Sequence, residues 1–191
     1  MTKYAHRTAL VSGEATGIGL AIAKRLVEGG ATVLLTARTD EERALAIAEL
    51  GSAARVVTPS AVEAALMGGG SIGSGDACLP GGVDLLFADA VPAARPLLPH
   101  LRDGGAVVLT APTPCADTVR ALAAELAFRG IRVNAVAPGC IEVPGSGTVP
   151  LPPLGRLGAA EEVARAALFL ATEATFTTGA RLPVDGGLGR P

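Results

Sequence analysis

The chain alternates short apolar runs with segments in which apolar residues recur at helical spacing. Apolar runs of strand length lie at Thr8–Ser12, Ala31–Ala37, Ala54–Val57, Val83–Ala88, Gly105–Thr110, Ile131–Val136 and Ala180–Val184. Segments with helical periodicity lie between them, at Ile18–Leu26, Thr39–Leu50, Ala61–Met67, Ala93–Arg102, Thr113–Arg129 and Ala159–Thr172. Strands that alternate with helices predict a doubly wound parallel sheet with helices on both faces.

Helix boundaries are marked by polar residues and glycines. Asp40 is a candidate N-cap for the second helix, and Thr113 with Pro114 forms a candidate N-cap and first helical position for the fifth. The Gly-rich stretch Gly68–Gly82 is expected to form a flexible surface loop, and Pro138–Gly158 is a second loop rich in proline and glycine. The 191 residues are the length of one domain, so we expect a single α/β domain spanning 1–191.

The first strand leads into a glycine-rich turn. Thr8–Gly19 reads TALVSGEATGIG, with glycines at 13, 17 and 19, and a helical pattern follows at once. Glycines let an anion approach the backbone, and the N–H groups at the start of the next helix favour a pyrophosphate. Close packing of helix against strand would also explain these glycines. The complete strand–helix–strand unit around them favours dinucleotide binding.

Composition narrows the set of partners. Hydrophobic residues make up 49% of the chain and charged residues 18%, which is typical of a globular protein. The net charge of −2 gives no reason to expect nucleic acid or an acidic membrane as a partner. The apolar runs are all shorter than a membrane span, and the first residues leave no room for a signal peptide before the first strand.

The cysteines favour a reducing compartment. Cys78, Cys115 and Cys140 are odd in number and lie at unrelated spacings, with neither a CxxC pair nor a metal-binding pattern. We therefore expect reduced thiols, a cytoplasmic location and no metal site.

Three stretches together resemble the short-chain dehydrogenase/reductase family. Ser12–Gly19 is similar to its TGxxxGIG fingerprint, and Ala121–Gly139 to its passage from the fifth helix into the sixth strand. Gly155–Gly187 resembles its closing helix, strand and VDGG turn, as written in 3-oxoacyl-(acyl-carrier-protein) reductases. The resemblance implies a Rossmann-type fold and an oxidoreductase that uses NAD(P)(H).

The resemblance also implies a set of cofactor-binding positions. They are Ser12, Gly13, Ala15, Thr16, Gly17, Ile18, Gly19, Arg38, Ala88, Pro138, Gly139 and Ile141. Arg38 follows the second strand at the position that reaches the adenosine ribose, and neither Asp nor Glu ends that strand. An arginine there accommodates a 2′-phosphate, whereas an acidic residue would bind a 2′-hydroxyl. NADP(H) is therefore favoured over NAD(H) as the dinucleotide.

The catalytic residues of the family are missing. Its members use a tyrosine as general acid/base with a lysine four residues on, supported by a serine and an asparagine. Counting along the chain puts that pair at Val108 and Pro112, and Tyr4 is the only tyrosine. The family's NNAG segment reads Ala88–Val91 here, and Val143 stands where a threonine would help to hold the nicotinamide.

The missing residues fall where the chain is short relative to the family. Shortened segments are expected around 68–82 and 88–116. Four residues near the expected carboxyl ends of the strands are weak candidate substitutes for the catalytic set: Thr110, Cys115, Cys140 and Glu142. A small buried thiol explains Cys115 and Cys140 more simply, and a solvated loop position explains Glu142.

Three functions remain open at this point. The first is an NADP(H)-binding protein that cannot run the family's Tyr/Lys-dependent carbonyl reduction and acts as a partner subunit or sensor. The second is an oxidoreductase or ketoreductase with a non-standard proton donor. The third is a structural or assembly protein without cofactor. The intact dinucleotide half beside an incomplete catalytic half favours the first.

Assembly is expected from the fifth helix and the last strand, which are the usual subunit contacts in the family. Leu122 and Leu126 on the helix, with Leu182 and Val184 on the strand, are predicted to leave apolar surface on a monomer. A homodimer or homotetramer formed through the 114–129 helix and the C-terminal strand would cover that surface.

Overall fold

A computed structural model describes residues 3–67, 82–111, 114–142 and 150–189. Most of the predicted loop Gly68–Gly82, together with Cys78, Thr113 and Val143, lies outside the described residues.

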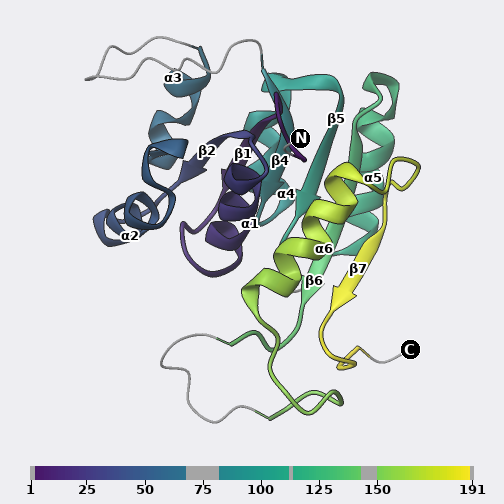
Figure 1. The fold of residues 1–191 in the computed structure, drawn as a ribbon. Helices are drawn as coiled ribbons and strands as arrows, with labels where there is room; N and C mark the ends of the chain where they lie inside the picture. The colour runs from purple at the N-terminus through teal and green to yellow at the C-terminus, as the bar shows by residue number, and fades with distance from the viewer. Residues whose placement is uncertain (1–2, 68–81, 112–113, 143–149, 190–191) are drawn as a thin grey trace.

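Seven parallel strands form one sheet in the order β3-β2-β1-β4-β5-β6-β7 (Figure 1). Their bounds are β1 Thr8–Ser12, β2 Thr32–Thr36, β3 Ala54–Val57, β4 Val83–Ala88, β5 Leu101–Leu109, β6 Arg132–Pro138 and β7 Arg181–Val184. The strand order reverses between β1 and β4, as in a Rossmann-type sheet. The predicted fold class and all seven predicted strands are confirmed.

Helices cover both faces of the sheet (Figure 1). One core cluster joins the sheet to helices α1 Gly17–Glu28, α2 Asp40–Leu50 and α6 Ala160–Thr172. The other joins it to α3 Val62–Met67, α4 Val91–Ala94 and α5 Ala116–Leu126. Short 3-10 turns follow at Gly51–Ala53, Pro59–Ala61, Arg95–His100 and Ala127–Arg129.

The central strands are apolar on both faces because each face is covered. Leu10 of β1 pairs in register with Leu34 of β2 and Leu86 of β4, and all three are fully buried under α3, α4 and α5. Val11 alternates to the other face and packs in the cluster under α1 and α6. Continuous apolar runs such as VDLLFA therefore form strands buried on both sides.

The predicted helix Ala93–Arg102 is wrong. The structure has one α-helical turn, Val91–Ala94, and then a 3-10 helix, Arg95–His100, after which β5 begins at Leu101. Pro96 and Pro99 have no N–H to donate, so the α-helical hydrogen-bond ladder cannot continue through them. The prediction rested on the helical spacing of the apolar residues and did not consider these two prolines.

Two predicted helix starts are also corrected. Thr39, and not Asp40, is the N-cap of α2, since its side-chain oxygen accepts the Glu42 N–H at 3.1 Å. Helix α5 begins at Ala116 after Cys115, so Pro114 precedes the helix instead of forming its first residue.

The apolar face predicted to remain on α5 is buried inside the chain. Leu122 and Leu126 are 1% and 5% exposed because they pack against the sheet, so their inclusion in an exposed surface is wrong. Leu182 and Val184 on β7 are half-buried. Large exposed apolar side chains lie elsewhere, including Phe128, Phe169 and Phe176. Within the described residues, none of the helices has both the length and the apolar character that a membrane crossing requires.

Candidate functional site

The carboxyl ends of β1, β2, β4 and β5 meet at one edge of the sheet because the strands are parallel. In such sheets a crevice opens where the strand order reverses, here between β1 and β4. The residues that follow these strands are therefore brought to the same place from distant parts of the sequence. The glycine-rich turn, Arg38 and Asp89 are the main polar features there.

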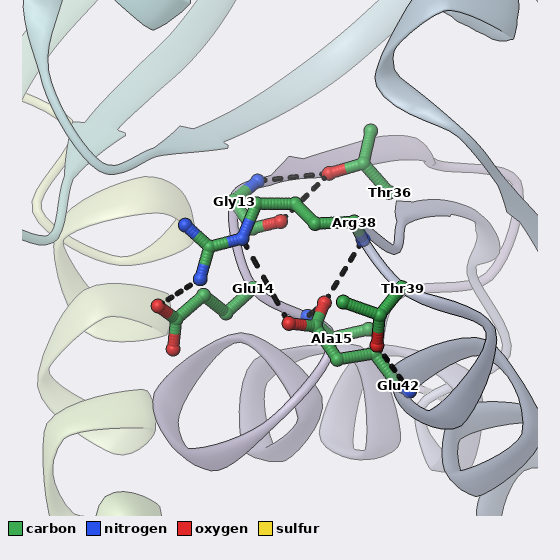
Figure 2. Close-up of polar contacts among 7 residues, drawn as sticks. All are labelled: Gly13, Glu14, Ala15, Thr36, Arg38, Thr39 and Glu42. Carbon is green, nitrogen blue, oxygen red and sulfur yellow. Dashed lines mark hydrogen bonds and ion pairs between the residues drawn. The ribbon is translucent and has the colours of Figure 1, made fainter.

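Gly13 is held by a threonine from the next strand. Its N–H donates to Thr36 Oγ1 at 2.9 Å, and the Thr36 hydroxyl donates back to the Gly13 carbonyl at 3.1 Å (Figure 2). Thr36 is 1% exposed and Gly13 is partly exposed, so this double contact is partly buried. The start of the turn is thereby fixed against β2 without using a bound ligand.

Two of the three glycines of the turn have no room for a side chain. Gly13 has φ +152°, and a Cβ built on it would lie 2.5 Å from Asp89 Oδ1. A Cβ on Gly19 would lie 2.3 Å from the Glu14 carbonyl oxygen. The Asp89 side chain leaves no room for a Cβ on Gly13, and the Glu14 backbone leaves none on Gly19. Thr16, the N-cap of α1, makes no side-chain cap hydrogen bond within the described contacts. Its side chain therefore does not occupy the first N–H groups of this helix.

Two carboxylates surround Arg38 at the end of β2 (Figure 2). Arg38 Nη2 forms an ion pair with Glu14 Oε1, and Arg38 Nε lies 3.8 Å from Glu42 Oε1. The second oxygen of Glu42 accepts the Arg38 backbone N–H at 2.9 Å and the Ala15 N–H at 3.3 Å. Arg38 is thus oriented over the glycine-rich turn, where the adenosine ribose of a dinucleotide would lie.

Asp89 follows β4 and places a third carboxylate beside the turn. Desolvation of its carboxyl against Gly13 raises the pKa of Asp89, and the nearby charge of Glu14 raises this pKa further, while Arg38 lowers it. Three carboxyl groups, of Glu14, Glu42 and Asp89, and one guanidinium, of Arg38, therefore lie close to the first glycine. A dinucleotide pyrophosphate bound there would lie close to these carboxyl groups.

Beyond Asp89 lies an apolar pocket of about 180 Å³. Its lining includes Asp89, Leu109, Cys115 and Thr118. Cys115 is exposed, and hydrogen bonds from Thr118 lower the pKa of its thiol. Thr110 directly follows β5, and its hydroxyl and N–H both donate to the Ala88 carbonyl, at 3.4 and 2.9 Å.

Cys140 and Glu142 lie in a different place, after β6. Cys140 lines a separate pocket of about 320 Å³ with Arg156, Glu162 and Asp185. The Glu142 N–H donates to the Gly158 carbonyl at 2.8 Å. The four weak catalytic candidates are therefore not gathered in one site. Among the residues that the structure describes, no group of three His, Cys, Asp or Glu side chains could hold a metal ion.

Five further predicted cofactor positions lie on three segments at the same edge of the sheet. Ser12 ends β1, Ala88 ends β4 and Pro138 ends β6. Gly139 packs so closely that a Cβ would lie 2.6 Å from Asp185 Cα, and Ile141 bridges to Gly158. Gly139 and Ile141 thus hold the segment after β6 in place through backbone contacts.

The only tyrosine lies far from this crevice. Tyr4 is 7% exposed, and its N–H donates to the Gly29 carbonyl at 2.7 Å, with its ring packed against Gly29 at the end of α1. That end of the helix is next to the start of β1, at the end of the sheet opposite to the carboxyl ends of the strands. The two lysines, Lys3 and Lys24, pair on the surface with Glu173 and Glu49.

Sequence reasoning missed four residues of the crevice: Glu14, Thr36, Glu42 and Asp89. The sequence could have pointed to Asp89, since this residue occupies an asparagine position of the family's NNAG segment. Glu42 stands three residues after Thr39, which is capping-box spacing, but its contact with Ala15 crosses between elements. The Thr36 contact with Gly13 has no signal in the local sequence.

Two family models match the chain. One described as short chain dehydrogenase matches residues 7–65, and one described as enoyl-(acyl carrier protein) reductase matches residues 113–189. Residues 66–112 lie between the two matches, and they contain most of both segments predicted to be shortened.

Individual relatives align over almost the whole chain. A 3-oxoacyl-(acyl-carrier-protein) reductase of Vibrio harveyi is 32% identical over 244 positions, which cover 95% of this chain and 97% of the relative. A cis-4-hydroxycyclohexanecarboxylate dehydrogenase of Sinomonas cyclohexanicum is 29% identical and covers 96% and 97%. Both alignments have more positions than this chain has residues, so the relatives contain internal segments that it lacks.

A solved structure gives the same result at the level of the fold. A crystal structure assigned as a betaketoacyl-ACP reductase superimposes with a TM-score of 0.73 and 28% identity, covering 96% of this chain and 98% of that one. With the sequence matches at both ends of the chain, this likeness establishes the family. The chain belongs to the short-chain dehydrogenase/reductase family of oxidoreductases.

Proposed function

We propose that this protein binds NADP(H) in preference to NAD(H) and does not run the family's tyrosine-dependent carbonyl reduction. Its role would then be that of a cofactor-binding partner subunit or sensor. The observation that carries the proposal is the position of Arg38 over the glycine-rich turn, in a crevice that contains neither tyrosine nor lysine among its described residues.

Cofactor binding would use the start of α1 and the end of β2. Members of the family bind a nicotinamide dinucleotide. The N–H groups around Gly17–Gly19 would hold its pyrophosphate, and the Arg38 guanidinium would bind the 2′-phosphate with charge-assisted hydrogen bonds. When bound, the nicotinamide supplies or accepts a hydride.

The expected inactivity follows from the missing proton donor. Hydride transfer to a carbonyl leaves an alkoxide that must be protonated. The Thr110 hydroxyl donates to the Ala88 carbonyl, and Tyr4 is buried at the other edge of the sheet. Loss of general acid catalysis typically costs about 10²–10⁴-fold in rate. Loss of oxyanion contacts adds about 10²–10³-fold.

The test is calorimetric titration with NADPH and NADH. We expect NADPH to bind at least about tenfold more tightly, because hydrogen bonds to a charged group are worth about 1.5–3 kcal/mol. Arg38→Ala should remove most of this preference. Arg55→Ala, which removes an exposed arginine of β3, should leave the preference unchanged. Equal affinity of the wild type for both cofactors would refute the preference, and failure to bind either would favour the assembly role.

The same samples test turnover. We expect no oxidation of NADPH with 3-oxoacyl thioesters or simple ketones above a blank without protein. Protein-dependent oxidation would overturn the proposed inactivity and support a non-standard proton donor. Asp89 would then be added to Thr110, Cys115, Cys140 and Glu142 as a residue to substitute, since it lines the pocket beyond the turn.

We further propose that the protein forms a homodimer or homotetramer and works in the cytoplasm. The apolar side chains exposed near β7 and at the end of α5 support assembly. The described cysteines, Cys115 and Cys140, are free thiols, which supports a reducing compartment.

A further inference from the structure

The arginine that would recognise the 2′-phosphate is already engaged by a carboxylate. Arg38 and Glu14 form an ion pair in which both side chains are about half exposed, at 53% and 55% (Figure 2). Glu14 belongs to the glycine-rich turn itself, between Gly13 and Ala15. The ion pair therefore lies at the place where the adenosine half of a dinucleotide would enter.

The two carboxylates around Arg38 have different roles. Glu42 is 15% exposed and accepts backbone N–H groups from both Arg38 and Ala15, so it joins α2 to the turn and cannot leave without breaking these contacts. For Glu14, the described polar contact of the side chain is the one with Arg38. Glu14 is thus the partner that can move away.

Binding of a 2′-phosphate would have to displace this partner. A phosphate bound in a bidentate manner would use two N–H groups of Arg38, and Nη2 already donates to Glu14. A carboxylate left beside a phosphate of charge near −2 would also repel it. A 2′-hydroxyl meets neither obstacle.

We infer that Glu14 sets the selectivity of this site by competing with the 2′-phosphate of NADP(H) for Arg38. The inference rests on the proposed binding of a dinucleotide at the glycine-rich turn. Glu14 is a specificity-determining residue: it reduces the affinity for NADP(H) and leaves that for NAD(H) nearly unchanged. The natural preference for NADP(H) is then smaller than the site could provide.

The test uses 2′,5′-ADP and 5′-AMP, which differ by the 2′-phosphate alone. Glu14→Gln should tighten 2′,5′-ADP binding about threefold to tenfold, since one like-charge contact near 4 Å in water is worth about 1 kcal/mol. Binding of 5′-AMP should change less than about twofold. Glu28→Gln removes an equal charge at the other end of α1 and should change neither.

A double variant separates competition for Arg38 from simple repulsion. In an Arg38→Ala background, Glu14→Gln should lose most of its gain toward 2′,5′-ADP. A gain that persists there, or that is equal for 5′-AMP, would overturn the inference. If the wild type has no 2′-phosphate preference but Glu14→Gln acquires one, the proposed cofactor preference fails while the inference holds. If Glu14→Gln gains nothing, the inference fails whatever the wild type prefers.

Discussion

Asp89 adds a carboxyl group to the candidate cofactor site beside the glycine-rich turn. Asp89 occupies an asparagine position of the family's NNAG segment, and its Oδ1 lies against the Cα of Gly13. An asparagine would fill the same space without charge. Desolvation and the charge of Glu14 raise the pKa of Asp89, so the folded protein resists ionisation of this group.

Replacing Asp89 by asparagine should strengthen dinucleotide binding. We expect the affinities for NADH and NADPH to rise together by about threefold to tenfold, because one negative charge near the pyrophosphate is removed. Calorimetric titration checks this expectation. Asp103→Asn, at the start of β5 and the opposite edge of the sheet, is the matched control. A gain confined to NADPH would show that Asp89 acts on the 2′-phosphate instead.

The Asp89→Asn variant should also differ from the wild type in how its stability depends on pH. Because the pKa of Asp89 is raised on folding, its contribution to stability is full below the unfolded pKa and is lost as pH rises through the folded pKa. Asp89→Asn should therefore melt at a higher temperature than the wild type at pH 7. The difference should shrink as the pH falls toward about 4. A difference that does not depend on pH would contradict this assignment.

At the scale of elements, helix α6 depends on a glutamate that reaches back over its start. Ala159, the N-cap, has no polar side chain, and the Glu162 carboxylate accepts its N–H at 2.9 Å. Arg156 donates to both oxygens of this carboxylate at 2.8 Å. Mainly through the Arg156 hydrogen bonds, the pKa of Glu162 falls to about 2.

Glu162→Gln should destabilise the protein at neutral pH by weakening both contacts. Since the pKa of Glu162 is lowered on folding, its contribution is present above the unfolded pKa of 4.5 and is lost as pH falls toward about 2. Thermal melts should show the variant below the wild type at pH 7, with the gap closing below pH 4.5. Glu161→Gln, an exposed carboxylate in the same first turn, should show a much smaller gap.

At the scale of the whole molecule, the sheet ends at an edge strand with apolar side chains near it. β7 pairs with β6 on one side, and Phe176 in the preceding loop is fully exposed at 104%. Phe169 on α6 is 48% exposed. A second copy that covered these rings and the free edge would remove apolar surface from water.

We expect light scattering at micromolar concentration to give the mass of a dimer or tetramer. Phe176→Asp should raise the dissociation constant at least about tenfold, as expected for a buried aromatic anchor. Leu45→Asp, at an exposed apolar position of α2, should leave the mass unchanged. A monomeric wild type would rule out the proposed assembly.

The amino-acid sequence alone was enough to predict the alternation of strands and helices along the chain and the glycine-rich turn. Runs such as Val83–Ala88 are unambiguous because parallel strands covered on both faces are apolar throughout. The turn could be predicted because its glycines, the strand before it and the helix after it are adjacent in the chain. The absence of a Tyr–Lys pair also follows from the sequence, since Tyr4 is the only tyrosine.

The side chains that surround those residues come from segments that are distant in the sequence. The contacts of Glu42 with Ala15 and of Asp89 with Gly13 join segments 27 residues apart or more, and local patterns carry no record of such pairs. The same holds for Leu122 and Leu126, whose helical spacing marked an apolar face without saying that the sheet of the same chain covers it. Periodicity identifies which side chains avoid water, but the folded chain determines what they pack against.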